Sequence, residues 1–340
     1  MTGRVFVSGG SGYIAGFLIR QLITDGWTVH TTVRSLAAEG MVRERLGVDA
    51  NRLRFFAADL NDDAGWADAM SGCRCAAHVA SPLPAGVPKH ADELVVPARD
   101  GALRALRAAR AAGVQRFVMT SSVAAISYGR GRGEHHFTEA DWTPLSAPGI
   151  TPYVQSKTVA ERAARDWVAR EGGGLQFCTI NPSVVLGPVS SDDYSASIII
   201  VQKLLDGGLL ACPDIGFGVV DVRDVADLHV RALMAPANMA GERFIASGRF
   251  MKLREIADVL RAELGPQAHR VTTHNLPDWA VRVAALINPV ARAFVGEIGS
   301  VRHQDASHAN AVLGWVARPV EQSIADTARS LIELGIVEPR

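Results

Sequence analysis

The sequence has no excess of either charge, because 35 Lys and Arg residues balance 35 Asp and Glu residues over 340 positions. A neutral chain lacks the broad electrostatic field that draws nucleic acid or an anionic membrane surface to a protein. It also lacks a long apolar run. The stretch from Ile198 to Val201 ends at Gln202, well short of the roughly 20 residues that span a bilayer. We therefore expect neither a nucleic acid nor a membrane as a partner.

Cysteine is scarce, with only four residues, at positions 73, 75, 178 and 212. Only the first two are close together, and no second pair or histidine cluster completes the spacing of a zinc site. The His135-His136 pair has no partner at metal-binding spacing either. We therefore expect reduced cysteines in the core and no metal. The first strand begins almost at Met1 with no apolar leader before it, so we expect a cytoplasmic protein.

The first half of the chain alternates short apolar segments with amphipathic ones. The short segments predict strands over 4–8, 27–33, 53–57, 76–80, 116–120 and 175–180. The segments between them, such as 101–112, predict helices. Nearly continuous apolar strands separated by helices indicate a parallel sheet that is covered on both faces. The expected fold class is therefore α/β, a doubly wound parallel sheet of the Rossmann type.

The second half is less regular, because glycine and proline interrupt it at places such as Gly187-Pro188 and Gly207-Gly208. We expect a dinucleotide-binding Rossmann domain over 1–186 that residues 219–246 complete. Residues 187–218 and 247–318 would form a smaller, discontinuous and mainly helical substrate-binding region, followed by a C-terminal helix over 319–340. Such a region usually lies over the carboxyl ends of the strands, where open α/β sheets bind ligands.

A glycine-rich segment, Gly9-Gly10-Ser11-Gly12-Tyr13-Ile14, joins the first predicted strand to the first predicted helix. Gly9 permits a tight turn, and Gly12 lets the backbone approach a pyrophosphate closely. The helix N-terminus adds free N–H groups and a partial positive charge for the phosphates. The segment therefore predicts a dinucleotide site that includes Gly9, Ser11, Gly12, Tyr13 and Ile14.

The end of the second predicted strand carries Arg34, where NAD-binding proteins usually place a carboxylate. A carboxylate would repel a 2′-phosphate, whereas a guanidinium pairs with it through two parallel hydrogen bonds. Arg34 therefore favours NADP(H) as the cofactor. Asp59 and Leu60 follow the third strand, where we expect them to meet the adenine.

Tyr153 and Lys157 lie four residues apart at the start of a predicted amphipathic helix, so they share one helical face. A free phenol has a pKa near 10, which is too high for easy proton exchange at neutral pH. We expect the ammonium of Lys157, together with an oxidised nicotinamide, to lower the pKa of Tyr153. Thr120, Ser121 and Ser122 end the fifth strand, where a serine hydroxyl can orient a substrate carbonyl.

Together, the segments GGSGYIAG, VRS, ADL, HVASP, RFVMTSS, YVQSK, INPSVVLGP and VDVRDVADLHV resemble extended short-chain dehydrogenases/reductases of the NAD-dependent epimerase/dehydratase superfamily. Within it the chain is most similar to the branch of dihydroflavonol, cinnamoyl-CoA and yeast-type carbonyl reductases. The resemblance implies that Ser122 and Tyr153 act on the substrate and that Lys157 modulates the tyrosine. It also implies cofactor contacts by Ala80, Ser81, Thr120, Tyr153, Lys157, Pro182, Ser183, Val184, Val185 and Ser197.

The chain departs from the dihydroflavonol reductase pattern just after the serine pair. Plant dihydroflavonol reductases carry an Asn or Asp there to hold flavonoid hydroxyls, whereas this chain reads Val123-Ala124-Ala125-Ile126-Ser127-Tyr128. The departure argues against a flavonoid and for a more apolar substrate pocket.

We therefore expect an NADP-dependent carbonyl (aldehyde or ketone) reductase or alcohol dehydrogenase that acts on a small molecule, as a monomer or homodimer. One alternative is an NAD-dependent nucleotide-sugar epimerase/dehydratase, which shares the Ser, Tyr and Lys set, although Arg34 disfavours NAD. A steroid-type 3-beta-hydroxy dehydrogenase is a variant of the first hypothesis. A cofactor-sensing protein without activity commonly lacks the tyrosine or the lysine, and both are present here.

Overall fold

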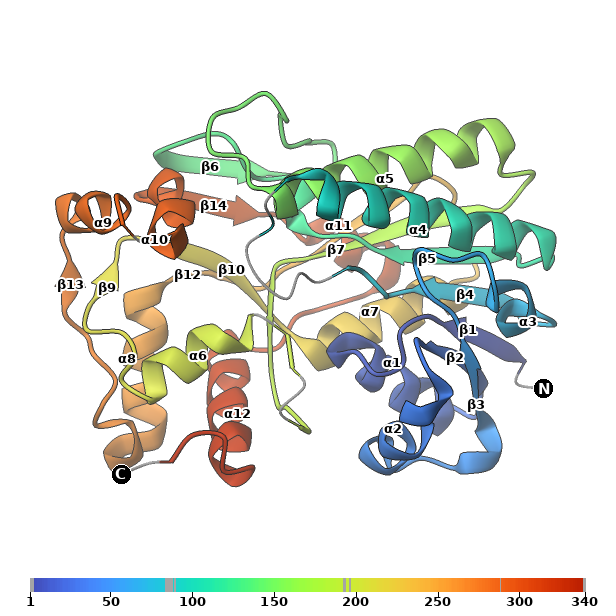
Figure 1. Ribbon diagram of the computed structural model, residues 1–340, viewed down its shortest axis with the longest axis horizontal. Helices are drawn as coiled ribbons and strands as arrows, with labels where there is room; N and C mark the ends of the chain where they lie inside the picture. The colour runs from blue at the N-terminus through green and yellow to red at the C-terminus, as the bar shows by residue number, and fades with distance from the viewer. Residues whose placement is uncertain are drawn as a thin grey trace.

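A seven-stranded parallel sheet organises the molecule, as the alternating pattern predicted (Figure 1). The structure is a computed structural model that describes residues 3–82, 88, 90–191, 194–195, 197–287 and 289–338. The strand order is β11-β7-β5-β4-β1-β2-β3. These strands span Arg4–Val7 (β1), Thr28–Val33 (β2), Leu53–Ala57 (β3), Cys75–His78 (β4), Arg116–Thr120 (β5), Gln176–Pro182 (β7) and Arg243–Ala246 (β11).

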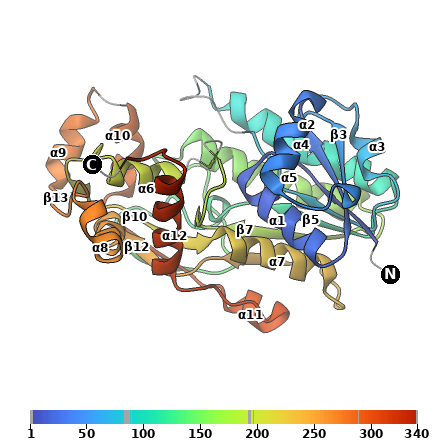
Figure 2. The ribbon, with the colours of Figure 1, turned by 90° about the horizontal axis from the view of Figure 1, so that it is seen from below.

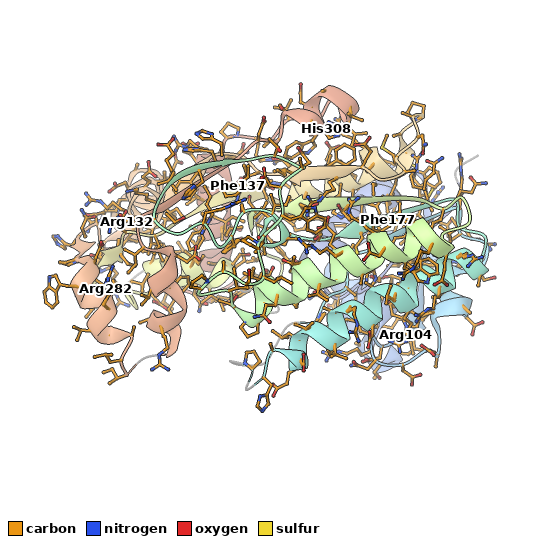
Figure 3. The ribbon with its side chains drawn as sticks, turned by 90° about the horizontal axis from the view of Figure 1, so that it is seen from above. Arg104, Arg132, Phe137, Phe177, Arg282 and His308 are labelled. Carbon is orange, nitrogen blue, oxygen red and sulfur yellow. The ribbon has the colours of Figure 1, made fainter. Side chains whose placement is uncertain are left out.

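Helices cover both faces of this sheet, which explains why its central strands are apolar throughout. Helices α1 (Tyr13–Thr24) and α7 (Val222–Met234) pack on one face, and their buried side chains join Val5 and Val118 in one cluster. Helices α3 (Trp66–Met70), α4 (Asp92–Ala111) and α5 (Pro152–Glu171) cover the other face with Phe117 and Phe177. Figure 3 shows α4 and α5 running side by side along this face.

A smaller region lies at the end of the molecule opposite the N-terminus (Figures 1 and 2). Its three-stranded sheet joins β8 (Val184–Leu186), β10 (Gly216–Asp221) and β12 (Phe250–Lys252). Around it pack α6 (Ile198–Leu205), α8 (Leu253–Leu264) and α12 (Val320–Glu333), and their buried side chains form a separate apolar cluster. Because β8 follows β7 after one residue, this region continues directly from the carboxyl end of a central strand.

The part of the chain after residue 250 is less helical than the sequence predicted. Besides β12, it contributes β13 (Asn275–Leu276), which pairs with β9 (Cys212–Pro213). It also contributes β14 (Ser300–Gln304), which pairs in parallel with β6 (Gly133–Phe137). These strands are short and their partners are distant in sequence, so local periodicity could not reveal them. The remaining helices are α2 (Glu39–Leu46), α9 (Asp278–Ala284), α10 (Pro289–Phe294) and α11 (Ser307–Leu313).

The expectation of reduced, buried cysteines is confirmed. All four cysteines are free and buried. Burial raises the pKa of the Cys73 and Cys178 thiols to about 12, so both stay protonated. No helix within the described residues combines the length and the apolar content that crossing a bilayer requires.

Candidate functional site

In the glycine-rich turn between β1 and α1, Gly9 and Gly10 have no room for a side chain. Gly9 has a φ of 71°, and a Cβ there would lie 3.0 Å from the Cβ of Ala80. A Cβ on Gly10 would lie 2.4 Å from Oγ1 of Thr31, closer than atoms can approach. The Gly9 N–H donates to Oγ1 of Thr32 at 3.0 Å, which fixes the turn against β2. The turn therefore lies at the carboxyl edge of the sheet, and no side chain of Gly9 or Gly10 covers its backbone.

Helix α1 begins directly after this turn and presents an open N-terminus. Gly12 occupies the N-cap, supplies no capping side chain and is exposed, and no acidic residue lies in the first turn. The Tyr13 hydroxyl donates to the carbonyl oxygen of Gly187 at 2.8 Å and ties the helix to the smaller region. Ile14 is partly buried against the α1 side of the core. Open N–H groups at a helix start are the usual partners of a phosphate.

Arg34 follows β2 and is exposed, and the structure gives its guanidinium no hydrogen bond or ion pair within the described residues. Two neighbouring arginines are already engaged. Arg43 binds Glu39 at 2.8 Å, and Arg45 donates to the carbonyl oxygen of Ser11. Arg34 is therefore the cation near the glycine-rich turn that is best placed to receive a further anionic partner.

Asp59 and Leu60 follow β3. Asp59 bonds within its own turn, whereas Leu60 lines a hollow. The Asp59 carboxylate accepts from the backbone N–H of Asn61 at 2.8 Å, so part of its hydrogen-bonding capacity is used locally. Leu60 packs against Gly101, where a Cβ would meet it at 2.8 Å. Leu60 lines this hollow at the carboxyl edge together with His78, Ala80, Ser81, Pro82, Ala98, Ala102, Met119, Thr120, Lys157 and Ala160.

Helix α5 carries Tyr153 and Lys157, two of the predicted catalytic residues, on its first turns. Thr151 caps it by accepting from the Val154 N–H at 3.3 Å, and Pro152 supplies a backbone angle suited to a helix start. Lys157 lies one turn after Tyr153, with its Nζ atom 5.7 Å from the centre of the Tyr153 ring. That Nζ atom donates to Oγ of Ser81 at 2.9 Å. This hydrogen bond joins α5 to the segment after β4 at the carboxyl edge of the sheet.

Ser122 lies beside Tyr153 at the end of β5. Its Oγ atom accepts from the Ala124 N–H at 3.1 Å and reaches the carbonyl oxygen of Pro182 at 3.5 Å. The Ser122 side chain also acts on the Tyr153 phenol and favours a lower pKa. Ser122, Tyr153 and Lys157 therefore form one cluster, assembled from a strand end and a helix start.

Burial raises the pKa of the Tyr153 phenol above its usual range, although 41% of the residue remains accessible to solvent. Ser122 opposes this rise without cancelling it. The expected lowering of this pKa by Lys157 together with an oxidised nicotinamide concerns the cofactor-bound state and stays a prediction. The raised pKa keeps Tyr153 a neutral phenol, the form that can donate a proton.

Burial lowers the pKa of Lys157 to about 8, because little water reaches its ammonium group. The ammonium is charged below that pH and neutral above it. If the charged form is needed to hold a cofactor ribose, apparent affinity for NADPH should fall as the pH rises through about 8. Fluorescence titration of NADPH from about pH 6 to about pH 10 measures this effect. Constant affinity across that range would show that the charge of Lys157 plays no part in binding.

Thr120 lines the same hollow as Leu60 and also contacts a buried histidine. His229 is fully buried, and burial lowers its pKa to about 4, so its ring is neutral. Its Nδ1 atom lies 2.8 Å from the carbonyl oxygen of Val225, which can only accept, so Nδ1 carries the ring proton. The Thr120 hydroxyl therefore donates to Nε2 at 2.7 Å and keeps its lone pairs for another donor.

The segment after β7 contains a polar atom with no partner. Ser183 is 8% exposed, and its buried hydroxyl lacks a hydrogen-bond partner among the described residues. Pro182 and Ser183 pair with Ala246 of the neighbouring strand β11, while Val184 and Val185 form β8 against β10. Ser197 lies before α6 and donates to the carbonyl oxygen of Val185 at 2.7 Å. Ser183 is thus positioned to bond a ligand, whereas the Ser197 hydroxyl is engaged within its own loop.

The apolar segment after the serine pair fills the core. Val123 and Ile126 are buried in a small cluster with Phe137 and Ile245. Ser127, at the end of this segment, donates to the carbonyl oxygen of Val123 and accepts from Nε2 of Gln304. The segment therefore packs within the core and supports the adjacent Ser122.

Sequence reasoning missed Glu161, a buried residue that links Ser121, after β5, to Asn181 of β7. Glu161 is fully buried, and its carboxylate accepts from Ser121 at 2.5 Å and from the Asn181 side chain at 2.8 Å. The same Asn181 amide group donates to the backbone carbonyl of Ser122 at 3.2 Å. The available signal was spacing, because Glu161 lies one turn beyond Lys157 on the same helical face.

Three other polar residues near the site have structural roles. His78 is buried with its Nδ1 atom 3.0 Å from Oγ of Ser8, and burial lowers its pKa to about 3. Asp221 caps α7, and Asp224 accepts from the backbone N–H of Arg318 at 2.8 Å. These groups therefore stabilise the frame of the site.

The resemblance inferred from the motifs is confirmed by comparison with known proteins. The model of the NAD dependent epimerase/dehydratase family matches residues 5–246. The chain belongs to this family, the extended short-chain dehydrogenases/reductases.

The relatives of this family member are reductases. The chain is 35% identical to cinnamoyl-CoA reductase CAD2 of Medicago truncatula over 74% of its own length and 76% of the relative's. It is 32% identical to cinnamoyl-CoA reductase 1 of Arabidopsis thaliana over 98% and 91% of the two chains. Its fold matches yeast methylglyoxal/isovaleraldehyde reductase Gre2, solved with NADPH, with a TM-score of 0.78, 24% identity and coverage of 98% and 99%.

Proposed function

We propose that this protein is an NADPH-dependent reductase of small aldehydes or ketones, which also oxidises the corresponding alcohols in reverse. The observation that supports this most is the cluster of Ser122, Tyr153 and Lys157 at the same sheet edge as the glycine-rich turn. The relatives that share most of its length are named as reductases of carbonyl compounds.

The residues at the sheet edge fit a dinucleotide cofactor. The crowded turn at Gly9 and Gly10 leaves the backbone bare, and the α1 N-terminus is open to phosphate. Arg34 would meet a 2′-phosphate, and the unpartnered Ser183 hydroxyl would bond the nicotinamide end. We propose that Ser11, Tyr13, Ile14, Asp59, Leu60, Ala80, Ser81, Thr120, Pro182, Val184, Val185 and Ser197 complete the site. When bound, NADPH would supply the hydride.

The protein's own groups would then act on the carbonyl oxygen. Ser122 lies near enough to Tyr153 to affect its pKa, and both hydroxyls would donate to the same oxygen atom. As negative charge develops there, the neutral phenol donates its proton. The Lys157 ammonium, 5.7 Å from the ring, favours the phenolate that remains. The raised pKa of Tyr153 keeps the proton in place until the substrate oxygen becomes basic.

Replacing Arg34 by Ala should raise the KM for NADPH by roughly tenfold to a hundredfold, because hydrogen bonds to a charged group contribute about 1.5–3 kcal/mol each. The KM for NADH should change little, since NADH has no 2′-phosphate. Steady-state kinetics with both cofactors measures the effect. Arg170→Ala removes another exposed arginine, from the end of α5, and serves as the matched control. An equal loss with both cofactors would remove Arg34 from phosphate recognition.

The function is tested by following NADPH and NADH consumption with aliphatic aldehydes, aryl ketones, β-ketoesters, hydroxy-ketones and flavanonols. The proposal predicts consumption of NADPH with at least one carbonyl class and a preference over NADH. Binding of NADPH with no turnover over the whole panel would contradict it. Tightly retained NAD with no net cofactor consumption would instead favour a nucleotide-sugar epimerase or dehydratase, a second activity class in this family.

A further inference from the structure

Three side chains on the surface strands β6 and β14 converge at one point. The two strands pair in parallel, and the register places His136 directly opposite His303. Glu134 lies two residues before His136 on the same strand, so its side chain emerges on the same face. Figure 3 labels Arg132, one residue before β6, and Phe137, the last residue of β6. The sequence had predicted no metal ligands here, because His303 is remote from the other two residues along the chain.

The ligand-type atoms of this trio lie close together. Oε1 of Glu134 is 2.9 Å from Nε2 of His303 and 3.6 Å from Nε2 of His136. One ligand atom from each of the three residues lies within 4.8 Å of the others. The two imidazole rings stack with their centres 4.8 Å apart and their planes at 22°. Two ligands on one tetrahedral zinc lie about 3.3–3.5 Å apart, so small rotations of the side chains would suffice.

We propose that Glu134, His136 and His303 form a binding site for a divalent transition metal ion, with Zn²⁺ as its probe. Two imidazoles and one carboxylate are the donor types that zinc accepts, and three protein ligands leave a fourth position for water. The side chains are 65%, 76% and 41% exposed in that order, which gives an ion direct access from solvent.

Arg302 does not compete for this face. Arg302 precedes His303 on β14, so its side chain emerges on the opposite face. It is 4% exposed and paired with Glu297. The carboxylate of Glu134 therefore faces two imidazoles that can turn their lone pairs toward a metal.

Metal binding would tie two distant parts of the chain together. Glu134 and His136 belong to the segment between β5 and α5, whereas His303 belongs to the segment before α11. Gln304, next to His303, donates to Oγ of Ser127, five residues beyond Ser122. A bound ion should therefore stabilise the strand pair that braces the back of the candidate active site.

Isothermal titration of the full, untagged chain with ZnCl₂ tests the proposal. We expect one equivalent to bind, and we expect His136→Ala and His303→Ala each to weaken binding at least about tenfold, as loss of a ligand contact does. Mg²⁺ and Ca²⁺ should not displace Zn²⁺, because they prefer sites built of oxygen ligands. Zn²⁺ should also raise the melting temperature of the wild type but not of the two variants.

Two further variants keep the test decisive. His269→Ala removes an exposed histidine outside this trio and should bind like the wild type. Glu134→Gln keeps the size of the side chain, and it should weaken binding even if a histidine variant folds poorly. The proposal is overturned if the wild type binds no Zn²⁺. It is equally overturned if the His136→Ala, His303→Ala double variant binds Zn²⁺ as tightly as the wild type.

Discussion

Replacing Tyr153 by Phe should lower kcat for carbonyl reduction by about 10²- to 10⁴-fold, the usual contribution of a positioned general acid. The substitution removes the phenol hydroxyl and leaves the ring, whose centre lies 5.7 Å from Nζ of Lys157. Because the phenol acts on the substrate oxygen, the dissociation constant for NADPH should change far less than kcat. Single-turnover kinetics and a fluorescence titration of NADPH separate the two quantities.

A matched tyrosine provides the control for this substitution. Tyr194 donates to Oε1 of Gln202 at 2.8 Å and lies outside the cluster of Ser122, Tyr153 and Lys157. Tyr194→Phe should therefore keep kcat within a few-fold of the wild type. Near-normal turnover of Tyr153→Phe with NADPH and a good substrate would remove Tyr153 from the proposed chemistry.

Replacing Glu161 by Ala should lower the free energy of unfolding by about 3–5 kcal/mol, the cost of breaking a buried ion pair by removing one partner. Its carboxylate lies 2.7 Å from Nε of Arg243, whose side chain is 6% exposed. Burial alone would raise the pKa of Glu161, but Arg243 and Arg165 outweigh it and lower the pKa. The variant leaves Arg243 charged and buried without its partner.

The lowered pKa of Glu161 also sets the pH dependence of this contribution. A carboxyl group with a lower pKa in the folded state stabilises fully above its unfolded pKa, near 4.3. The stabilisation is lost as the pH falls through the lower, folded value. Urea unfolding at neutral pH and at about pH 3 should therefore show a smaller difference between wild type and Glu161→Ala in acid.

An exposed ion pair gives the comparison for Glu161. Glu321 pairs with Arg249, and their side chains are 42% and 57% exposed. Glu321→Ala should cost no more than about 1 kcal/mol, because solvent screens exposed pairs. If Glu161→Ala cost as little as Glu321→Ala, the buried network would not stabilise the sheet edge.

The part of the fold that the sequence predicts well depends on local patterns. Each central strand is a short apolar run between helices, as in Arg116–Thr120, where every residue is buried. The glycine-rich turn is equally local, since the crowding at Gly9 and Gly10 arises within one strand, turn and helix. Tyr153 and Lys157 could be paired in advance because four residues make one helical turn.

The part that could not be predicted depends on pairing between distant segments. β6 and β14 are more than 160 residues apart, so the meeting of His136 and His303 follows only from the folded register. The burial of the Tyr153 phenol is a second feature of this kind. The sequence showed a nearby lysine but not how closely protein atoms surround the phenol, and this burial raises its pKa.

The fate of deuterium tests the central claim, hydride transfer to a carbonyl carbon, most directly. NADPH labelled with deuterium on one face or the other of nicotinamide carbon 4 would be incubated, in separate runs, with a carbonyl compound that the protein reduces. Mass spectrometry of the alcohol then reports the label. The proposed function predicts one deuterium on the carbinol carbon from one labelled face, with the rate of labelling greatly reduced in Tyr153→Phe. An alcohol that carries no deuterium from either face would contradict it.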